Sequence, residues 1–113
     1  MIIDVAKTID SPAALSREQG NIVFNIIVKH LSEDESVVLD FCDIESIITP
    51  FLNTSIGQLY SKYSSEKLSN SLRIVNIPKG TVQKFNNVIA NAKAFYANHA
   101  IYQQAVEDGV NNI

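Results

Sequence analysis

The polar side chains that could do chemistry gather early in the second third of the chain. Asp40, Asp43 and Glu45 place three carboxylates within six residues, and Cys42 is the only cysteine. Carboxylate oxygens are the ligands that hard divalent cations prefer. A thiol can act as a nucleophile when the fold brings a histidine base to it. Neither chemistry is completed by a neighbour in the sequence, so both depend on what the fold brings to these residues.

A structural explanation is available for the same residues. Asp40 ends an apolar run, where an aspartate commonly caps a loop by accepting from nearby backbone amides. Cys42 is expected to be a buried, inert thiol. His30 and His99 follow no ligand or base pattern. We therefore predict no catalytic residue, metal site or cofactor, and keep a small enzyme using Asp40, Cys42 and Asp43 as the weaker alternative.

The elements around these residues form a strand, a loop and a helix. Val37–Phe41 is a nearly continuous apolar run, which is typical of a central parallel strand covered on both faces. Thr49 and Pro50 predict a helix start, because proline costs nothing at the first helical position. Apolar residues at helical spacing extend this helix over 50–63.

The rest of the chain repeats the alternation of strands and helices. Ser16 and Gln19 form a capping-box pattern. Asn98 and His99 should interrupt the last long helical pattern, and the polar stretch 64–71 should be a connection. Strands are predicted over 1–8, 37–41 and 72–77, and helices over 16–31, 50–63, 81–97 and 100–107.

This order predicts an α/β fold with a small, mostly parallel sheet of three to four strands flanked by about four helices. The edge of so thin a sheet needs protection. Either the N-terminal segment folds into a hairpin that adds a strand, or a second chain covers the edge.

Length and composition limit the possible functions. A chain of 113 residues fits one domain, 1–113, and its net charge of −3 gives no drive toward nucleic acid or an anionic membrane. No stretch is apolar for long enough to cross a bilayer. With one cysteine and no leader pattern at the N-terminus, we expect a cytoplasmic protein.

The segment that runs from the strand Val37–Phe41 into the helix after Thr49 resembles a known family. Val37–Phe41, then Ile44 and Ile47, then Thr49-x-Phe51-Leu52-Asn53-x-x-Ile56-Gly57 resemble the STAS-like domains of unknown function. These are relatives of the sulfate-transporter and anti-sigma-factor-antagonist (STAS) domain. Ser16-Arg17-x-x-Gly20 and the strand beginning at Arg73 are similar to the family as well, so the resemblance covers about 16–89.

The resemblance implies a regulatory module and also shows two departures from it. Anti-sigma-factor antagonists begin a helix with Asp-Ser-Ser-Gly, and a partner kinase phosphorylates one serine. Here Ile48, Thr49, Pro50 and Phe51 stand at those four positions, so only the hydroxyl is retained. The N-terminal hairpin of full STAS domains is also shortened.

Six residues are the candidates for regulation or partner binding. Thr49 is either a phosphoacceptor or a plain helix N-cap, and the N-cap is favoured. Arg17 is either a ligand for a phosphate or a partner's carboxylate, or a solvated residue. The remaining candidates are Asp43, Glu45, Phe51 and Asn53.

These observations predict a non-enzymatic module that binds a protein partner, which the resemblance makes a kinase-like ATPase or signalling protein. The alternative is a structural or oligomerising subunit that forms a homo-oligomer.

Overall fold

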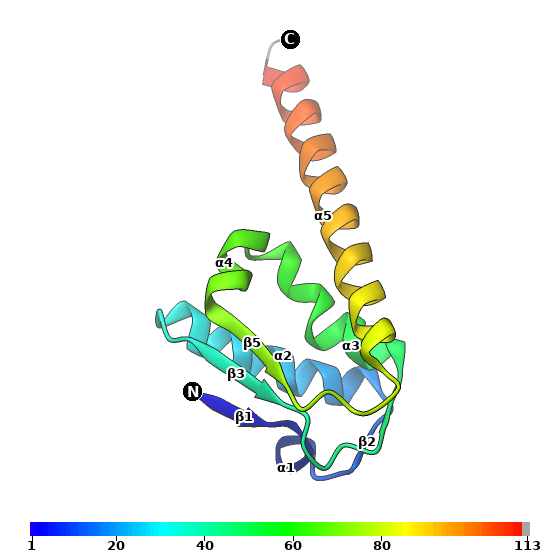
Figure 1. Ribbon diagram of the computed structural model, residues 1–113. Helices are drawn as coiled ribbons and strands as arrows, with labels where there is room; N and C mark the ends of the chain where they lie inside the picture. Colours follow the sequence, from blue (N-terminus) through cyan, green and yellow to red (C-terminus); the bar gives the residue numbers. More distant parts are fainter. Residues whose placement is uncertain (112–113) are drawn as a thin grey trace.

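The computed structural model describes the backbone of residues 1–111 and the side chains of residues 1–97 (Figure 1). In the described part, no helix is long and apolar enough to cross a membrane. The elements follow in the order β1 (Ile2–Asp4), α1 (Val5–Ile9), β2 (Ala13–Ala14), α2 (Arg17–Ser32), β3 (Val37–Asp40), β4 (Ser46–Ile47), α3 (Thr49–Ser55), the 3-10 helix η1 (Gly57–Ser61), α4 (Ser65–Ser71), β5 (Leu72–Val75) and α5 (Val82–Asn111).

The main sheet, sheet A, has three parallel strands in the order β1-β3-β5. This confirms the predicted α/β class. The predicted strand over 1–8 is too long, because Asp4 ends β1 and caps α1 by accepting from the Lys7 N–H. Among the described residues no hairpin adds a fourth strand, and β1 and β5 are the two edges of sheet A.

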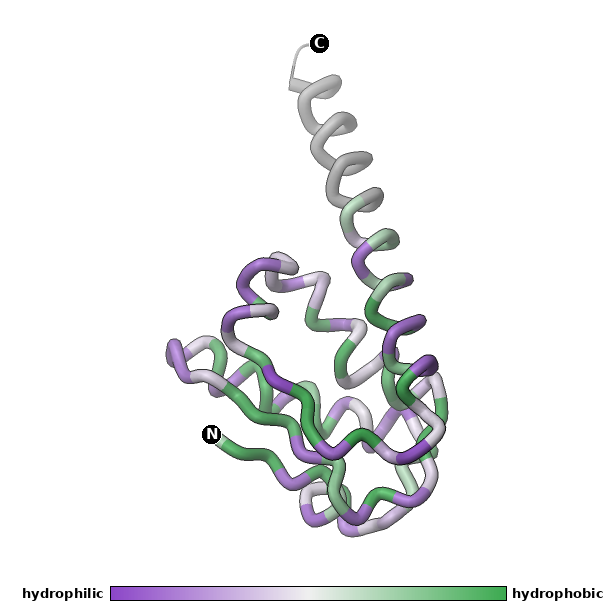
Figure 2. Tube along the Cα trace, in the orientation of Figure 1, coloured by the Kyte–Doolittle hydropathy of each residue, from purple (hydrophilic) through white to green (hydrophobic). Residues whose placement is uncertain are grey.

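Sheet A is covered on one face. α2 lies behind it in Figure 1, and hydrophobic residues run along its strands in Figure 2. Ile3 and Leu39 point to the helices and are buried, whereas Ile2 is 66% exposed and Val38 is half-buried. The prediction that Val37–Phe41 is covered on both faces is therefore wrong, since burial alternates along β3 with the two-residue period of a strand.

Two helices meet closely at Gly20. α2 begins with the predicted capping box, in which Ser16 accepts from the Gln19 N–H and the Gln19 side chain accepts from the Ser16 N–H. A Cβ on Gly20 would lie 2.8 Å from the Phe51 carbonyl oxygen and 2.9 Å from the Thr54 Cβ. The missing side chain is thus what lets α2 approach α3.

A second, two-stranded sheet was not predicted. In this sheet B, β2 pairs in parallel with β4, so that Ala13 lies opposite Ser46 and Ala14 opposite Ile47. The Ile48 N–H continues the pairing by donating to the Ala14 carbonyl at 3.1 Å. Lys84 of α5 adds a bond from its Nζ to the Ile47 carbonyl at 2.8 Å.

Three predictions about the helices are wrong. The helix over 50–63 is divided into α3 and η1 at Gly57, where glycine disfavours an α-helix by about 1 kcal/mol. The connection over 64–71 contains α4, which Ser64 caps by accepting from the Lys67 N–H. α5 continues through Asn98 and His99, so the helix over 100–107 is part of it. Asparagine and histidine are only mildly unfavourable within a helix.

Candidate functional site

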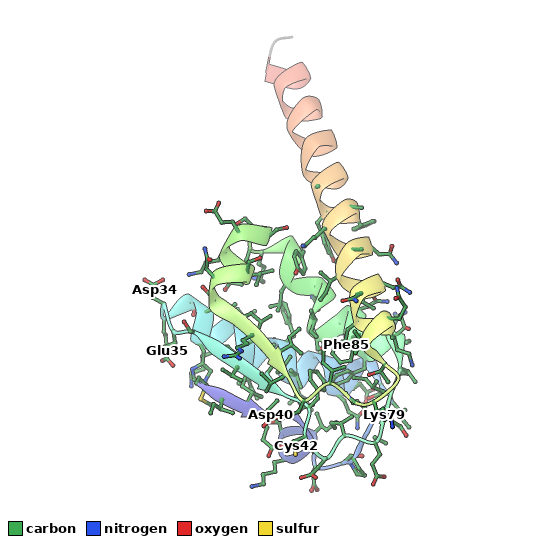
Figure 3. All side chains as sticks on the ribbon, in the orientation of Figure 1. Asp34, Glu35, Asp40, Cys42, Lys79 and Phe85 are labelled. Carbon is green, nitrogen blue, oxygen red and sulfur yellow. The ribbon has the colours of Figure 1, made fainter. Side chains whose placement is uncertain are left out.

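The carboxyl ends of the strands of sheet A are occupied by a capped loop. Asp40 Oδ1 accepts from the Cys42 N–H at 2.9 Å and from the Asn76 amide Nδ2 at 2.9 Å. Figure 3 shows Asp40 and Cys42 together where β3 ends. The prediction that Asp40 caps the loop is confirmed. Asn76 was missed because it lies 36 residues further along the chain, with no local pattern to signal the contact.

These two donors set the acidity of Asp40. The Asn76 amide first, and then the Cys42 N–H, stabilise the charged carboxylate and lower the pKa of Asp40 below its ordinary value. A lowered pKa in the folded state adds stability above the unfolded pKa. That stability is lost as the pH falls through the folded pKa.

We expect Asn76→Ala to raise the pKa of Asp40 toward its ordinary value, because the larger of the two stabilising bonds is removed. An NMR titration that follows the Asp40 carboxyl carbon measures this change. Asn86→Ala, at an exposed position of α5, is the control and should leave the titration as it is. An unchanged Asp40 pKa in Asn76→Ala would contradict the assignment.

Cys42 does not match its predicted environment. The thiol is exposed, so the prediction of a buried cysteine is wrong. It follows the buried end of β3 at a loop that faces solvent. The carboxylate of Asp43 is the largest cause that raises the pKa of Cys42, and the carboxylates of Asp40 and Asp4 add to it. A thiol with a raised pKa is mostly protonated at neutral pH and is a weak nucleophile.

His30, the histidine whose side chain the structure describes, is not arranged as a base for Cys42. His30 lies near the opposite end of β3, where its Nδ1 contacts the Glu35 carboxylate at 3.1 Å. Figure 3 shows Glu35 at that far end. His99 belongs to the part of α5 whose side chains lie outside the described residues.

The same end of the sheet holds a cluster that the sequence analysis missed. His30, Glu33 and Glu35 each offer one ligand atom, and these atoms lie within 4.8 Å of one another. The hydrogen bond to His30 is the first cause that lowers the pKa of Glu35. The spacing His-x-x-Glu-x-Glu at the end of a helix could have signalled it. Asp40, Asp43 and Glu45, whose carboxylates the sequence analysis considered and did not predict as a cation site, form no such group among the described residues.

Sheet B places the starts of α2 and α3 beside each other. Arg17 begins α2 three residues after β2, and Thr49 begins α3 two residues after β4. Both side chains are exposed. Glu45, the residue before β4, is also exposed. Its N–H donates to the carbonyl of Pro12, the residue before β2, at 2.7 Å. Arg17 and Thr49 thus lie at neighbouring helix starts after sheet B, and Glu45 lies at the other end of the same sheet.

The predicted N-cap at Thr49 is wrong. Ile48 is the N-cap residue of α3, and no side chain caps the helix. Ile48 finishes its extended pairing with Ala14, while its own carbonyl already accepts from the Leu52 N–H at 3.3 Å. Thr49 is therefore the first helical residue, and none of the bonds found among the described residues commits its hydroxyl to a cap.

Two other candidates lie outside this region. Phe51 is fully buried at 0% exposure, so its prediction as a partner-binding residue is wrong, because the helix turns its ring into the core. Asn53 is exposed, but it lines a groove with Gly57 and Phe95 on the side of α5. Gly57 faces the Val88 and Ala92 side chains at ordinary distances, so the close approach of another backbone occurs at Gly20 and not here.

Leu15 was missed by the sequence analysis and completes this region. It is 50% exposed and lies between β2 and Ser16. An apolar residue before an N-cap usually packs on the fourth helical residue. That residue is Gly20 here, which has no side chain to receive it. Leu15, Arg17, Glu45 and Thr49 are named the junction surface below.

Asp43 remains exposed and separate from the junction surface. It has a positive φ of 67° and lines a shallow pocket with Lys7 and Asp10 beside α1. Its role as a partner contact stays a prediction.

These observations define an α/β module whose polar loop residues hold the fold, with an exposed junction between paired helix starts. The model of the family described as STAS-like domain of unknown function (DUF4325) matches residues 19–80, from the first turn of α2 to the turn before α5. This is more than half of the chain, and the chain belongs to that family. No curated protein and no solved structure matches it.

Proposed function

We propose that this chain is a non-enzymatic regulatory module that binds a protein partner through the junction surface. The observation that carries the proposal is the pairing of β2 with β4, which sets the exposed Leu15 and Arg17 at the start of α2 beside Thr49 at the start of α3, with Glu45 at the other end of the same pairing. An apolar side chain surrounded by polar and charged groups is the composition of a protein-binding patch.

The side chains with catalytic potential favour a binding role over an enzymatic one. Asp40 is engaged by two donors of its own loop. The Cys42 thiol has a raised pKa and no described histidine beside it. A hydrolase or transferase needs a nucleophile, a base and a pocket in which they converge.

The partner class follows from the family resemblance. A kinase-like ATPase or another signalling protein is the partner we propose, which would place the module in the cytoplasm. Arg17 would pair with a carboxylate or phosphate of the partner, since its guanidinium can donate two parallel hydrogen bonds. Thr49 offers a free hydroxyl where a phosphate would meet the positive end of a helix.

Thr49→Ala and Thr49→Asp together test whether added charge at the junction surface is recognised by the partner. Both should leave the fold intact, because Thr49 is exposed and caps nothing. Thr49→Asp should even stabilise α3 by about 0.3–1 kcal/mol, since an anion is favourable at a helix start. If binding depends on the shape of the junction, both substitutions change it equally, which is the result we expect.

The measurement is recovery of the partner from native extract on immobilised protein, quantified by mass spectrometry. Lys62→Glu, an exposed reversal of charge at the end of η1, is the control and should retain full recovery. Arg17→Glu should reduce recovery at least about tenfold, as removing a charged contact does at a protein interface. Equal recovery with Arg17→Glu and Lys62→Glu would refute the proposal.

A further inference from the structure

The uncovered face of sheet A presents a definite arrangement of residues. The register places Ile2, Val38 and Arg73 in one row across the strands, and Asp4, Asp40 and Val75 in the next. Ile2 is 66% exposed, and neither Val38 nor Val75 is among the residues that pack on the core. No helix of the described residues covers these two rows, as Figure 1 shows.

A bare face is unusual for a parallel sheet. Parallel sheets occur almost only with both faces covered, because their strands are stabilised by burial on each side. Two further bonds continue the pairing of β1 with β3, since the Met1 amino group donates to the Ser36 carbonyl at 2.9 Å and the Val38 N–H donates to the Met1 carbonyl at 2.8 Å. The face carries three apolar residues, Ile2, Val38 and Val75, with charges at two corners and with Asp40 in the middle of one row.

The charges make this face complementary to itself. Ile2 and Val75 occupy one pair of diagonal corners of the two rows, while Asp4 and Arg73 occupy the other pair. A two-fold axis along the diagonal from Ile2 to Val75 would place each of these apolar residues over its own copy. The same axis would lay Arg73 of each copy over the row that contains Asp4 and Asp40 of the other.

We propose that this face binds a second copy of the chain, with the two sheets crossing nearly at right angles. Such orthogonal packing is one of the two preferred arrangements of stacked sheets. Rows of three strands, spaced about 4.8 Å apart, make a small interface. The dimer should therefore be weak, and added salt should weaken it further by screening the two sets of Arg73 contacts.

Analytical ultracentrifugation of the full chain, from about 10 µM to about 1 mM, measures the dimer, because an interface below the standard size is expected to associate weakly. Ile2→Glu should raise the dissociation constant at least about tenfold, since it places a charge at the apolar corner. Ile22→Glu is the matched control. Ile22 is also exposed, at 47%, but lies on α2, and its substitution should leave the dimer unchanged.

An exchange of charges tests the orientation of the two copies. Arg73→Asp and Asp4→Arg should each be monomeric alone, because like charges then face each other. Mixed together they should form a heterodimer, because each altered corner meets its opposite. Asp4 also caps α1, so circular dichroism should confirm that Asp4→Arg is folded.

A wild-type chain that stays monomeric at the highest concentration would overturn the proposal, as would an Ile2→Glu variant that dimerises like the wild type. Failure of the mixture to associate, with both variants folded, would overturn the Arg73 pairing. The proposal does not rest on the junction surface. Arg17→Glu should leave the dimer intact, so the dimer and the partner binding at the junction surface can be refuted independently.

Discussion

Phe51→Ala should lower the free energy of unfolding by about 3–5 kcal/mol, the usual cost of removing a buried aromatic ring. Phe51 is fully buried in α3, and its carbonyl accepts from the hydroxyl of Ser55, the one buried polar side chain of the described core. Domains of this size are stable by only about 5–15 kcal/mol. Urea unfolding followed by circular dichroism should therefore show a much earlier transition.

Phe95→Ala is the control for this substitution. Phe95 is 61% exposed and contacts Tyr96 edge-to-face, with ring centroids 4.9 Å apart. The loss should be limited to about 1 kcal/mol, the value of one aromatic pair. If Phe51→Ala were as mild as Phe95→Ala, the burial of Phe51 would be wrong, and its original prediction as a binding residue would return.

Gly20→Ala should destabilise the protein, although alanine is the better helix former by about 1 kcal/mol. The added Cβ would lie 2.8 Å from the Phe51 carbonyl oxygen, a distance that real Cβ atoms essentially never show. α2 and α3 must then separate, at a cost of about 1–3 kcal/mol for overpacking, and Gly20→Val should cost more. The midpoint of chemical unfolding measures the effect.

Gly57→Ala separates this clash from the general effect of glycine. Its Cβ would meet the Val88 Cγ1 at 3.5 Å and the Ala92 Cβ at 3.7 Å, which are ordinary contacts. This substitution should therefore be neutral or stabilising. Equal effects at Gly20 and Gly57 would mean that the close approach of α2 and α3 does not limit the packing.

Long periodic segments were predictable from the sequence, because they carry their own signals. α2 was predicted within one residue of each end from its capping box, and β3 within one residue from its apolar run. The strand over 72–77 was predicted two residues too long, because the positive φ of Asn76 ends β5 at Val75. Sheet B was not predictable. Each of its strands has two residues, too few to show an alternating pattern, and the two strands lie far apart in the sequence.

The candidate site, too, was predictable only where the signal is local in the sequence. Asp40 was correctly predicted to cap its loop, because the pattern of a strand ending in aspartate is local. Phe51 was wrongly predicted to bind a partner, because the family motif includes this residue but does not show whether its ring points to solvent or into the core. Position 51 lies next to Leu52 and one turn from Ser55, on a helix whose buried side is set by its packing on α2 and α5.

Hydrogen exchange of the backbone amides, on the chain alone and with its recovered partner, tests the proposed docking most directly. If the junction surface is the binding site, exchange should slow over residues 13–18 and 44–50 and stay unchanged on α4. The Leu15 N–H, which donates to the Gln19 side chain at 2.8 Å, lies in the centre of the first segment. Slowing confined to sheet A or to the groove beside α5, with the junction unaffected, would contradict the account.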